Sequence, residues 1–165
     1  MSTNEPMLHM MCGKVAAGKS TLAARLSAQP ATVLIVEDEW LNALYADELS
    51  LPKDYVRCTG KLRAALTSHI AHLLEVGVSV VLDFSSNTVQ QRRWMRDLLD
   101  ETQAAHEMHV LRTPDAECLA RLKVRNAVGE HPFTVTEEQF HAFSWHFTEP
   151  SPDEGFNLVL HGAAD

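Results

Sequence analysis

The chain has 165 residues, of which 45% are hydrophobic and 22% charged, a composition typical of a globular protein built around one core. Its formal net charge of −8 argues against binding to duplex nucleic acid, which needs many lysine and arginine contacts to phosphate. No apolar run approaches the length of a membrane span, no segment resembles a secretion signal, and the three cysteines are widely spaced. We therefore expect a cytoplasmic protein with reduced thiols and no membrane partner.

Short apolar runs alternate with longer stretches of helical periodicity along the chain. Runs such as VSVVL are β-branched and continuous, which is typical of strands covered on both faces in a parallel sheet. The predicted strands cover residues 8–12, 33–37, 78–83, 106–112 and 157–161, and the predicted helices cover residues 19–28, 61–76, 89–103, 114–128 and 136–147. This order predicts one α/β domain over residues 1–165, a three-layer sandwich around a five-stranded parallel sheet.

Between the first predicted strand and the first predicted helix lies the segment Gly13-Lys14-Val15-Ala16-Ala17-Gly18-Lys19-Ser20, which matches the phosphate-loop pattern GxxxxGK[ST]. The two glycines let the backbone wrap so that its N–H groups point at phosphate oxygens, and the helix N-terminus adds positive potential. The whole segment is therefore predicted to bind the triphosphate of ATP. We expect Lys19 to contact the β and γ phosphates, Ser20 to ligate Mg²⁺ and Thr21 to reach the α phosphate. The alternative is a glycine-rich turn with a solvated first helical turn.

A second carboxylate follows the apolar run 78–82. Asp83 stands where phosphate-loop proteins place the acidic residue that supports Mg²⁺, although an aspartate there can also cap the next helix or turn the chain. The residue after it is Phe84, where many hydrolysing ATPases have a glutamate that activates water. The pair therefore favours phosphoryl transfer over hydrolysis.

Asp38 follows the second predicted strand and should reach the same edge of the sheet, where ligands of open α/β folds bind. A carboxylate at this edge can orient an acceptor hydroxyl and accept its proton, so Asp38 is our candidate base. The alternative is that Asp38 only caps a helix that begins at Glu39 or Trp40.

Two arginines in the segment RLKVRN, Arg121 and Arg125, are four residues apart and therefore share one helix face. On a lid over residues 114–135 they would compensate the charge of the transferred phosphoryl group, with Arg121 at the nucleotide and Arg125 as a catalytic residue. The alternative is a solvated face on which Glu117 pairs with Arg121.

The nine histidines do not predict a metal site from their spacing. His106 and His109 lie three apart on a predicted strand, which turns them to opposite faces. His141 and His146 are five apart on a predicted helix, which does not match the usual ligand spacing. We therefore expect these side chains to be ordinary surface or core histidines.

Several segments occur in the order seen in a family of small kinases: GKVAAGKST, EDEW, VVLDFSSN followed by Arg92-Arg93, and RLKVRN. The chain resembles the polynucleotide-kinase and chloramphenicol-phosphotransferase-like group of P-loop kinases, and bacterial ATP-binding proteins labelled "AAA family ATPase". The resemblance implies a P-loop NTPase fold with a small helical lid, ATP as donor, Asp38 as base, Asp83 near Mg²⁺ and both lid arginines at the phosphates. The features of oligomeric unfoldases are lacking.

One position departs from that family. Polynucleotide kinases have an arginine three residues after the base to hold a phosphate on the acceptor, and here that residue is Leu41. Nucleic-acid ends are therefore disfavoured as substrates. We expect an ATP-dependent phosphotransferase that acts on a hydroxyl of a small molecule. The alternative is a regulatory switch that binds or hydrolyses ATP to control a protein partner.

Overall fold

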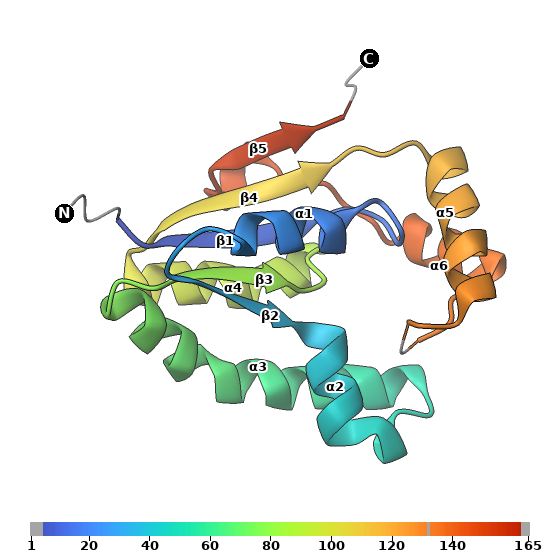
Figure 1. Cartoon of the computed structure of the whole chain (residues 1–165), viewed down its shortest axis with the longest axis horizontal. Coiled ribbons are helices and arrows are strands. Elements are labelled where there is room, and N and C mark those ends of the chain that lie inside the picture. Colours follow the sequence, from blue (N-terminus) through green and yellow to red (C-terminus); the bar gives the residue numbers. More distant parts are fainter. Residues whose placement is uncertain (1–4, 132, 163–165) are drawn as a thin grey trace.

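The strands form one parallel sheet, as predicted. A computed structural model of the chain describes residues 5–131 and 133–162, and within them the sheet has five strands in the order β2-β3-β1-β4-β5 (Figure 1). Every neighbouring pair is parallel. The strands are β1 (Met7–Cys12), β2 (Thr32–Val36), β3 (Ser79–Asp83), β4 (Ala105–Leu111) and β5 (Leu158–His161). Their carboxyl ends meet at one edge, which is where α/β folds bind ligands.

Helices cover both faces of the sheet, because alternate strand residues point to opposite sides. On one face α1 (Lys19–Ser27) packs Leu22 and Ala23 against Met11 of β1 and Val81 of β3. The other face carries the main core, where α3 (Pro52–Glu75) and α4 (Val89–Thr102) cover apolar side chains of β1 to β4. The predicted three-layer α/β fold is thereby confirmed.

The structure has more helix between β2 and β3 than the sequence predicted. A separate helix, α2 (Glu37–Tyr45), begins directly after β2, and the short 3₁₀ turn Ala46–Glu48 follows it. Helix α3 begins nine residues before the predicted start, at Pro52, which suits the first helical turn because its missing N–H has no helical partner there. Asp54 accepts a hydrogen bond from the backbone N–H of Leu51 at 2.8 Å and closes this start.

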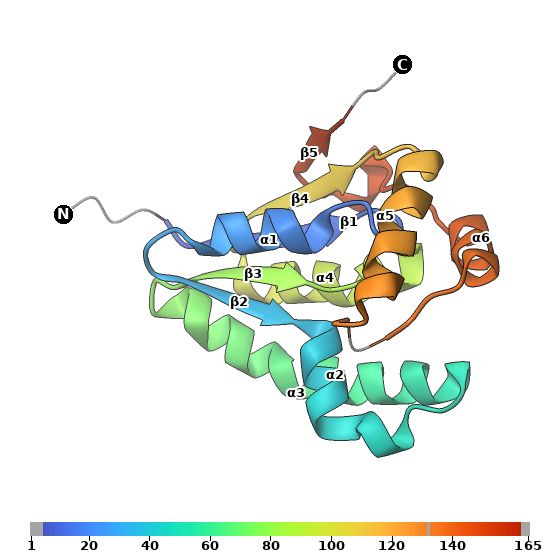
Figure 2. The same cartoon turned by 45° about the vertical axis from the view of Figure 1, so that its right-hand side comes forward.

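Two helices lie at the carboxyl edge of the sheet, α5 (Asp115–Val128) and α6 (Glu137–Trp145) (Figures 1 and 2). Helix α5 lies within the segment 114–135 that the sequence analysis expects to be a lid, and α6 follows that segment; we refer to α5 and α6 as the lid helices. Thr136 and Gln139 close the start of α6 in a capping box, as their spacing indicates. The segment that follows α5 reaches the start of α2, where His131 lies beside Asp38 (Figure 2). The lid therefore brings residues from the second half of the chain to the phosphate loop and to α2.

Candidate site for nucleotide and phosphoryl transfer

The predicted phosphate loop connects β1 to α1 in a tight turn. The N–H of Ala17 donates to the carbonyl of Lys14 at 3.1 Å, and two residues have positive φ angles, Ala16 at 61° and Gly18 at 105°. A φ of 105° is unfavourable for residues with a Cβ, which is a physical reason for glycine at position 18. The loop leads into the N-terminus of α1, which together with the wrapped backbone provides an environment for an anion.

Lys19 lies inside this loop. Its ammonium donates to the carbonyls of Gly13 at 2.5 Å and Lys14 at 2.8 Å. Burial lowers the pKa of Lys19 below its ordinary value, while the nearby carboxylate of Asp83 acts in the opposite direction. The ammonium is therefore held at the centre of the loop in surroundings where its charge interacts strongly with an anion.

Ser20 in the first turn of α1 and Asp83 at the end of β3 come together. The hydroxyl of Ser20 donates to Oδ2 of Asp83 at 2.6 Å. Asp83 does not cap the following helix, because Thr88 is the N-cap of α4 and accepts from the N–H of Gln91. A hydroxyl and a carboxylate offer oxygen donors of the kind that Mg²⁺ prefers, so these two residues fit a magnesium ion.

Asp38 lies in the first turn of α2, at the same edge of the sheet. The N-cap of this helix is Val36, so Asp38 is not the cap that the alternative interpretation supposed. Its carboxylate is 3.7 Å from Nε2 of His131 in the segment after α5. Burial raises the pKa of Asp38 above its ordinary value, and the charges of His131 and Arg125 partly oppose this effect. The structure thus brings Asp38 together with residues of the lid.

The two lid arginines occupy different places on one face of α5. Arg121 donates to the carbonyl of Ala17 in the phosphate loop at 3.2 Å and pairs with Glu117, as the alternative interpretation proposed. Arg125 lies deeper and towards Asp38, and its Nε is buried with no hydrogen-bond partner among the described residues. Burial lowers the pKa of Arg125, and Asp38 acts against this. A guanidinium with an unsatisfied buried donor is suited to an incoming anion.

The remaining predicted nucleotide-binding residues differ in where their side chains point. Lys14 reaches away to Asp115 at 2.7 Å and lies over the ring of Phe147, so only its backbone faces the loop interior. Thr21 is exposed in the first turn of α1. The apolar side of the loop, Val15, Ala16 and Ala17, packs against Cys118, Leu122 and Phe140 of the lid helices. The lid and the loop therefore share one small core.

Sequence reasoning missed Asn87, which fixes the first residue of the loop. Its side chain accepts from the N–H of Gly13 at 2.9 Å and donates to the carbonyl of Gly13 at 2.8 Å. The carbonyl of Asn87 also accepts from the N–H of Thr148. An asparagine in a turn gives no hint of a partner 74 positions away, because only the sheet order brings β3 beside β1.

A buried ion pair under the site was also missed. Arg63 of α3 donates to Glu37 at 2.8 and 3.3 Å, and to the carbonyls of Ser85 and Gln91 at 2.7 and 3.1 Å. Its guanidinium lies 5.1 Å from the ring centre of Trp94. Glu37 immediately precedes Asp38, so this pair fixes the start of α2 relative to the loop after β3.

A depression beside the phosphate loop is formed by residues from two further segments. Lys14, Leu111, Arg112, Thr113, Phe147 and Glu149 line it. Arg112 and Glu149 form an ion pair across it at 2.5 Å, and Thr113 donates to the carbonyl of Ala17 at 2.7 Å. It therefore adjoins the loop on the side away from Asp38.

One known family matches most of the chain. Residues 8–150 match the profile of the family described as AAA domain. The chain belongs to this family. The match spans β1 with its phosphate loop, the candidate base and both lid helices. No sequence of a curated protein matches the chain.

Solved structures share the fold at low sequence identity. A chain of the Pnkp1/Rnl/Hen1 RNA repair complex has a TM-score of 0.66 at 20% identity. The alignment covers 87% of this AAA-domain chain and 44% of the chain from the repair complex. This chain therefore spans under half the length of that relative. Kti12 from Chaetomium thermophilum, solved with ADP-AlF3, has a TM-score of 0.67 at 16% identity, with 94% and 88% covered. The Mycobacterium tuberculosis APS kinase CysC, solved with AMPPNP and APS, has a TM-score of 0.62 at 18% identity, with 97% and 91% covered.

The AAA-domain chain thus shares the P-loop NTPase fold with these structures, and its loop has the phosphate-loop pattern. Leu41, the position that departs from the polynucleotide-kinase pattern, is buried in the core at 2% exposure. No helix among residues 5–131 and 133–162 is long and apolar enough to cross a membrane.

Proposed function

We propose that this AAA-domain protein transfers the γ phosphate of ATP to a hydroxyl of a small-molecule acceptor. The observation that carries the proposal is the convergence of three separate elements at one edge of the sheet. Lys19 and the Ser20–Asp83 pair provide the donor side, and Asp38 faces them from α2. Arg125 of the lid lies within electrostatic reach of Asp38.

On the donor side, the loop N–H groups and Lys19 would hold the phosphates. Ser20 and Asp83 would hold a magnesium ion, which would supply positive charge beside the phosphates. Arg121 and Arg125 add positive charge from the lid, with Arg125 aimed at the oxygens of the transferred group. The depression between Arg112 and Phe147 adjoins the loop and is our proposed place for the adenine base.

On the acceptor side, Asp38 orients the acceptor hydroxyl and receives its proton. The acceptor oxygen forms the new bond to the γ phosphorus while the bond from that phosphorus to the β–γ bridging oxygen breaks, and ADP leaves. A carboxyl with a raised pKa suits this work, because a base is most effective when its pKa lies closer to the working pH.

Two features support transfer rather than hydrolysis. Phe84, the residue after Asp83, is 1% exposed in the core, so no carboxylate stands there to activate water. Leu41 is equally buried, and no arginine stands at that position to hold a phosphate on a nucleic-acid end. With the net charge of −8, these features favour a small acceptor that needs no extended basic surface.

The test measures ADP release from ATP and Mg²⁺ with a panel of hydroxyl-bearing small molecules. We expect one acceptor class to stimulate ADP release. Asp38→Asn should then lower kcat by about 10²- to 10⁴-fold, the usual contribution of a general base, with little change in ATP affinity. Asp47→Asn is the matched control, because Asp47 is exposed in the turn after α2. Full transfer activity in Asp38→Asn would remove Asp38 from the mechanism.

The second candidate function is a regulatory switch that binds ATP to control a protein partner. It is favoured by exposed aromatic side chains on α6, Phe143 at 53% and Trp145 at 86% exposure, next to the nucleotide loop. The same panel separates the two functions. A switch would show no stimulation by any acceptor, and its partner would bind in a way that depends on ATP and on Trp145.

A further inference from the structure

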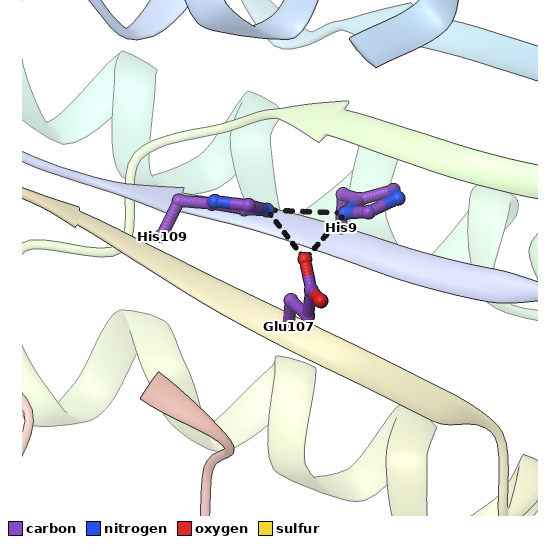
Figure 3. A group of neighbouring side chains, drawn as sticks. All are labelled: His9, Glu107 and His109. Carbon is purple, nitrogen blue, oxygen red and sulfur yellow. Dashed lines mark hydrogen bonds and ion pairs between the residues drawn. The ribbon is translucent and has the colours of Figure 1, made fainter. Parts of the chain in front are cut away.

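A cluster of metal-ligating side chains lies outside the nucleotide site, on β1 and β4. The parallel register sets His9 opposite Glu107, and Met11 opposite His109. Because side chains alternate along a strand, His9, Glu107 and His109 point to the same face as Met11, which is the face that α1 covers. Figure 3 shows both imidazole rings and the carboxylate converging on one point.

The three facing atoms have the separations of ligands around one metal ion. Nδ1 of His9 is 3.0 Å from Nε2 of His109, and Oε2 of Glu107 is 3.5 Å from the former and 3.3 Å from the latter. Donors about 2.0–2.1 Å from a tetrahedral zinc ion lie about 3.3 Å from one another. The observed triangle therefore needs almost no rearrangement to hold such an ion.

We propose that His9, Glu107 and His109 form a binding site for a divalent transition-metal ion of the zinc class. Two imidazole nitrogens and one carboxylate oxygen are a donor set that zinc uses when it keeps a fourth position for water or another ligand. His9 and Glu107 are partly exposed, at 16% and 32% of their side chains, so solvent reaches the outer side of the triangle.

A third histidine supports the site from behind. Nδ1 of His109 is 2.9 Å from Nε2 of His161 on β5. A hydrogen bond from Nδ1–H of His109 to His161 fixes the tautomer that leaves the lone pair of Nε2 free for a metal.

The proposed site is chemically distinct from the magnesium site at the phosphate loop. The loop pair offers oxygen atoms only, whereas this triangle offers two nitrogens, which divalent zinc favours and magnesium does not. His9 lies four residues before Gly13, or roughly 13 Å along an extended strand. A bound ion would tie the strand that carries the phosphate loop to the strand that leads into the lid.

The experiment uses untagged protein, stripped with a chelator and dialysed against Zn²⁺ in excess Mg²⁺, which saturates the oxygen-only site. We expect one zinc per chain, a melting temperature that rises with Zn²⁺ until the site is saturated, and a tetrahedral visible spectrum with Co²⁺. His9→Ala and Glu107→Gln should each weaken zinc binding at least about ten-fold, since loss even of a supporting residue costs 10- to 100-fold.

His146→Ala, a change at an exposed histidine beyond α6, is the matched control and should bind zinc as the wild type does. Circular dichroism in the presence of chelator verifies that each variant is folded. If His9→Ala is not folded, the nearly isosteric variant Glu107→Gln carries the test. The proposal would be overturned if the wild type failed to bind zinc, or if both variants bound zinc as tightly as the wild type does. Displacement of the bound zinc by Mg²⁺ would also overturn it. In that case the residues form only a hydrogen-bonded histidine row.

Discussion

Replacing Arg63 by methionine should destabilise the protein severely. The side chains of Arg63 and Glu37 are each 7% exposed and share two hydrogen bonds, so the change leaves a carboxylate buried without its partner. Breaking a buried pair from one side costs about 3–5 kcal/mol. The carbonyls of Ser85 and Gln91 also lose a donor, which places the expected loss at the upper end of that range.

For a chain of this length, each kcal/mol corresponds to about 2–4 °C, so a loss near 5 kcal/mol should lower the melting temperature by roughly 10–20 °C. Urea unfolding of Arg63→Met should show a lower midpoint with an unchanged slope, since the native fold is kept. The double variant with Glu37→Gln should be less destabilised than the sum of the single variants, because no buried charge remains.

Arg57→Met is the control on the same helix, because its pair with Glu48 is exposed at 44% and 50% of the side chains. It should leave the urea midpoint almost unchanged, as surface ion pairs add little. A midpoint for Arg63→Met close to that of Arg57→Met, or strict additivity in the double variant, would refute the reasoning. The pair would then be no more than a replaceable packing contact.

Three further outcomes follow from the site. The acid limb of the plot of transfer rate against pH should lie above the ordinary aspartate range, because burial raises the pKa of Asp38. Arg125→Gln should move this limb to higher pH, because it removes a positive charge that favours the ionised carboxylate. An unmoved limb would show that Arg125 does not act on the titration of Asp38. Asp83→Asn should raise the Mg²⁺ concentration needed for half-maximal rate, measured by titration at fixed ATP, and an unchanged requirement would exclude Asp83 as a ligand. Burial raises the pKa of Cys12 to about 11, so at pH 8 its thiol should resist a disulfide reagent until the protein is unfolded, and rapid labelling of the native protein would contradict this.

Local sequence was sufficient to place the strand segments along the chain and to identify the phosphate loop. Gly13, Gly18, Lys19 and Ser20 lie within eight consecutive residues, so the geometry of that loop depends on neighbours in the chain. The position of Asp83 at the end of an apolar strand could be predicted for the same reason, because the strand directly precedes it in the chain. Helix α2 entered the sequence analysis only through the alternative interpretation of Asp38, because its charged first turn follows β2 without any break.

The roles that depend on distant partners were decided only by the tertiary structure. Asn87 reaches Gly13, and Glu37 meets Arg63, through strand order and helix packing that no local pattern encodes. The histidines show this most clearly. The sequence predicted that His106 and His109 lie on opposite faces of a strand, which they do in β4. Only the parallel register of β1 and β4 sets His9 beside Glu107 and His109. Register between strands is fixed by burial across the whole sheet, so ligands on neighbouring strands become a site only in the folded chain.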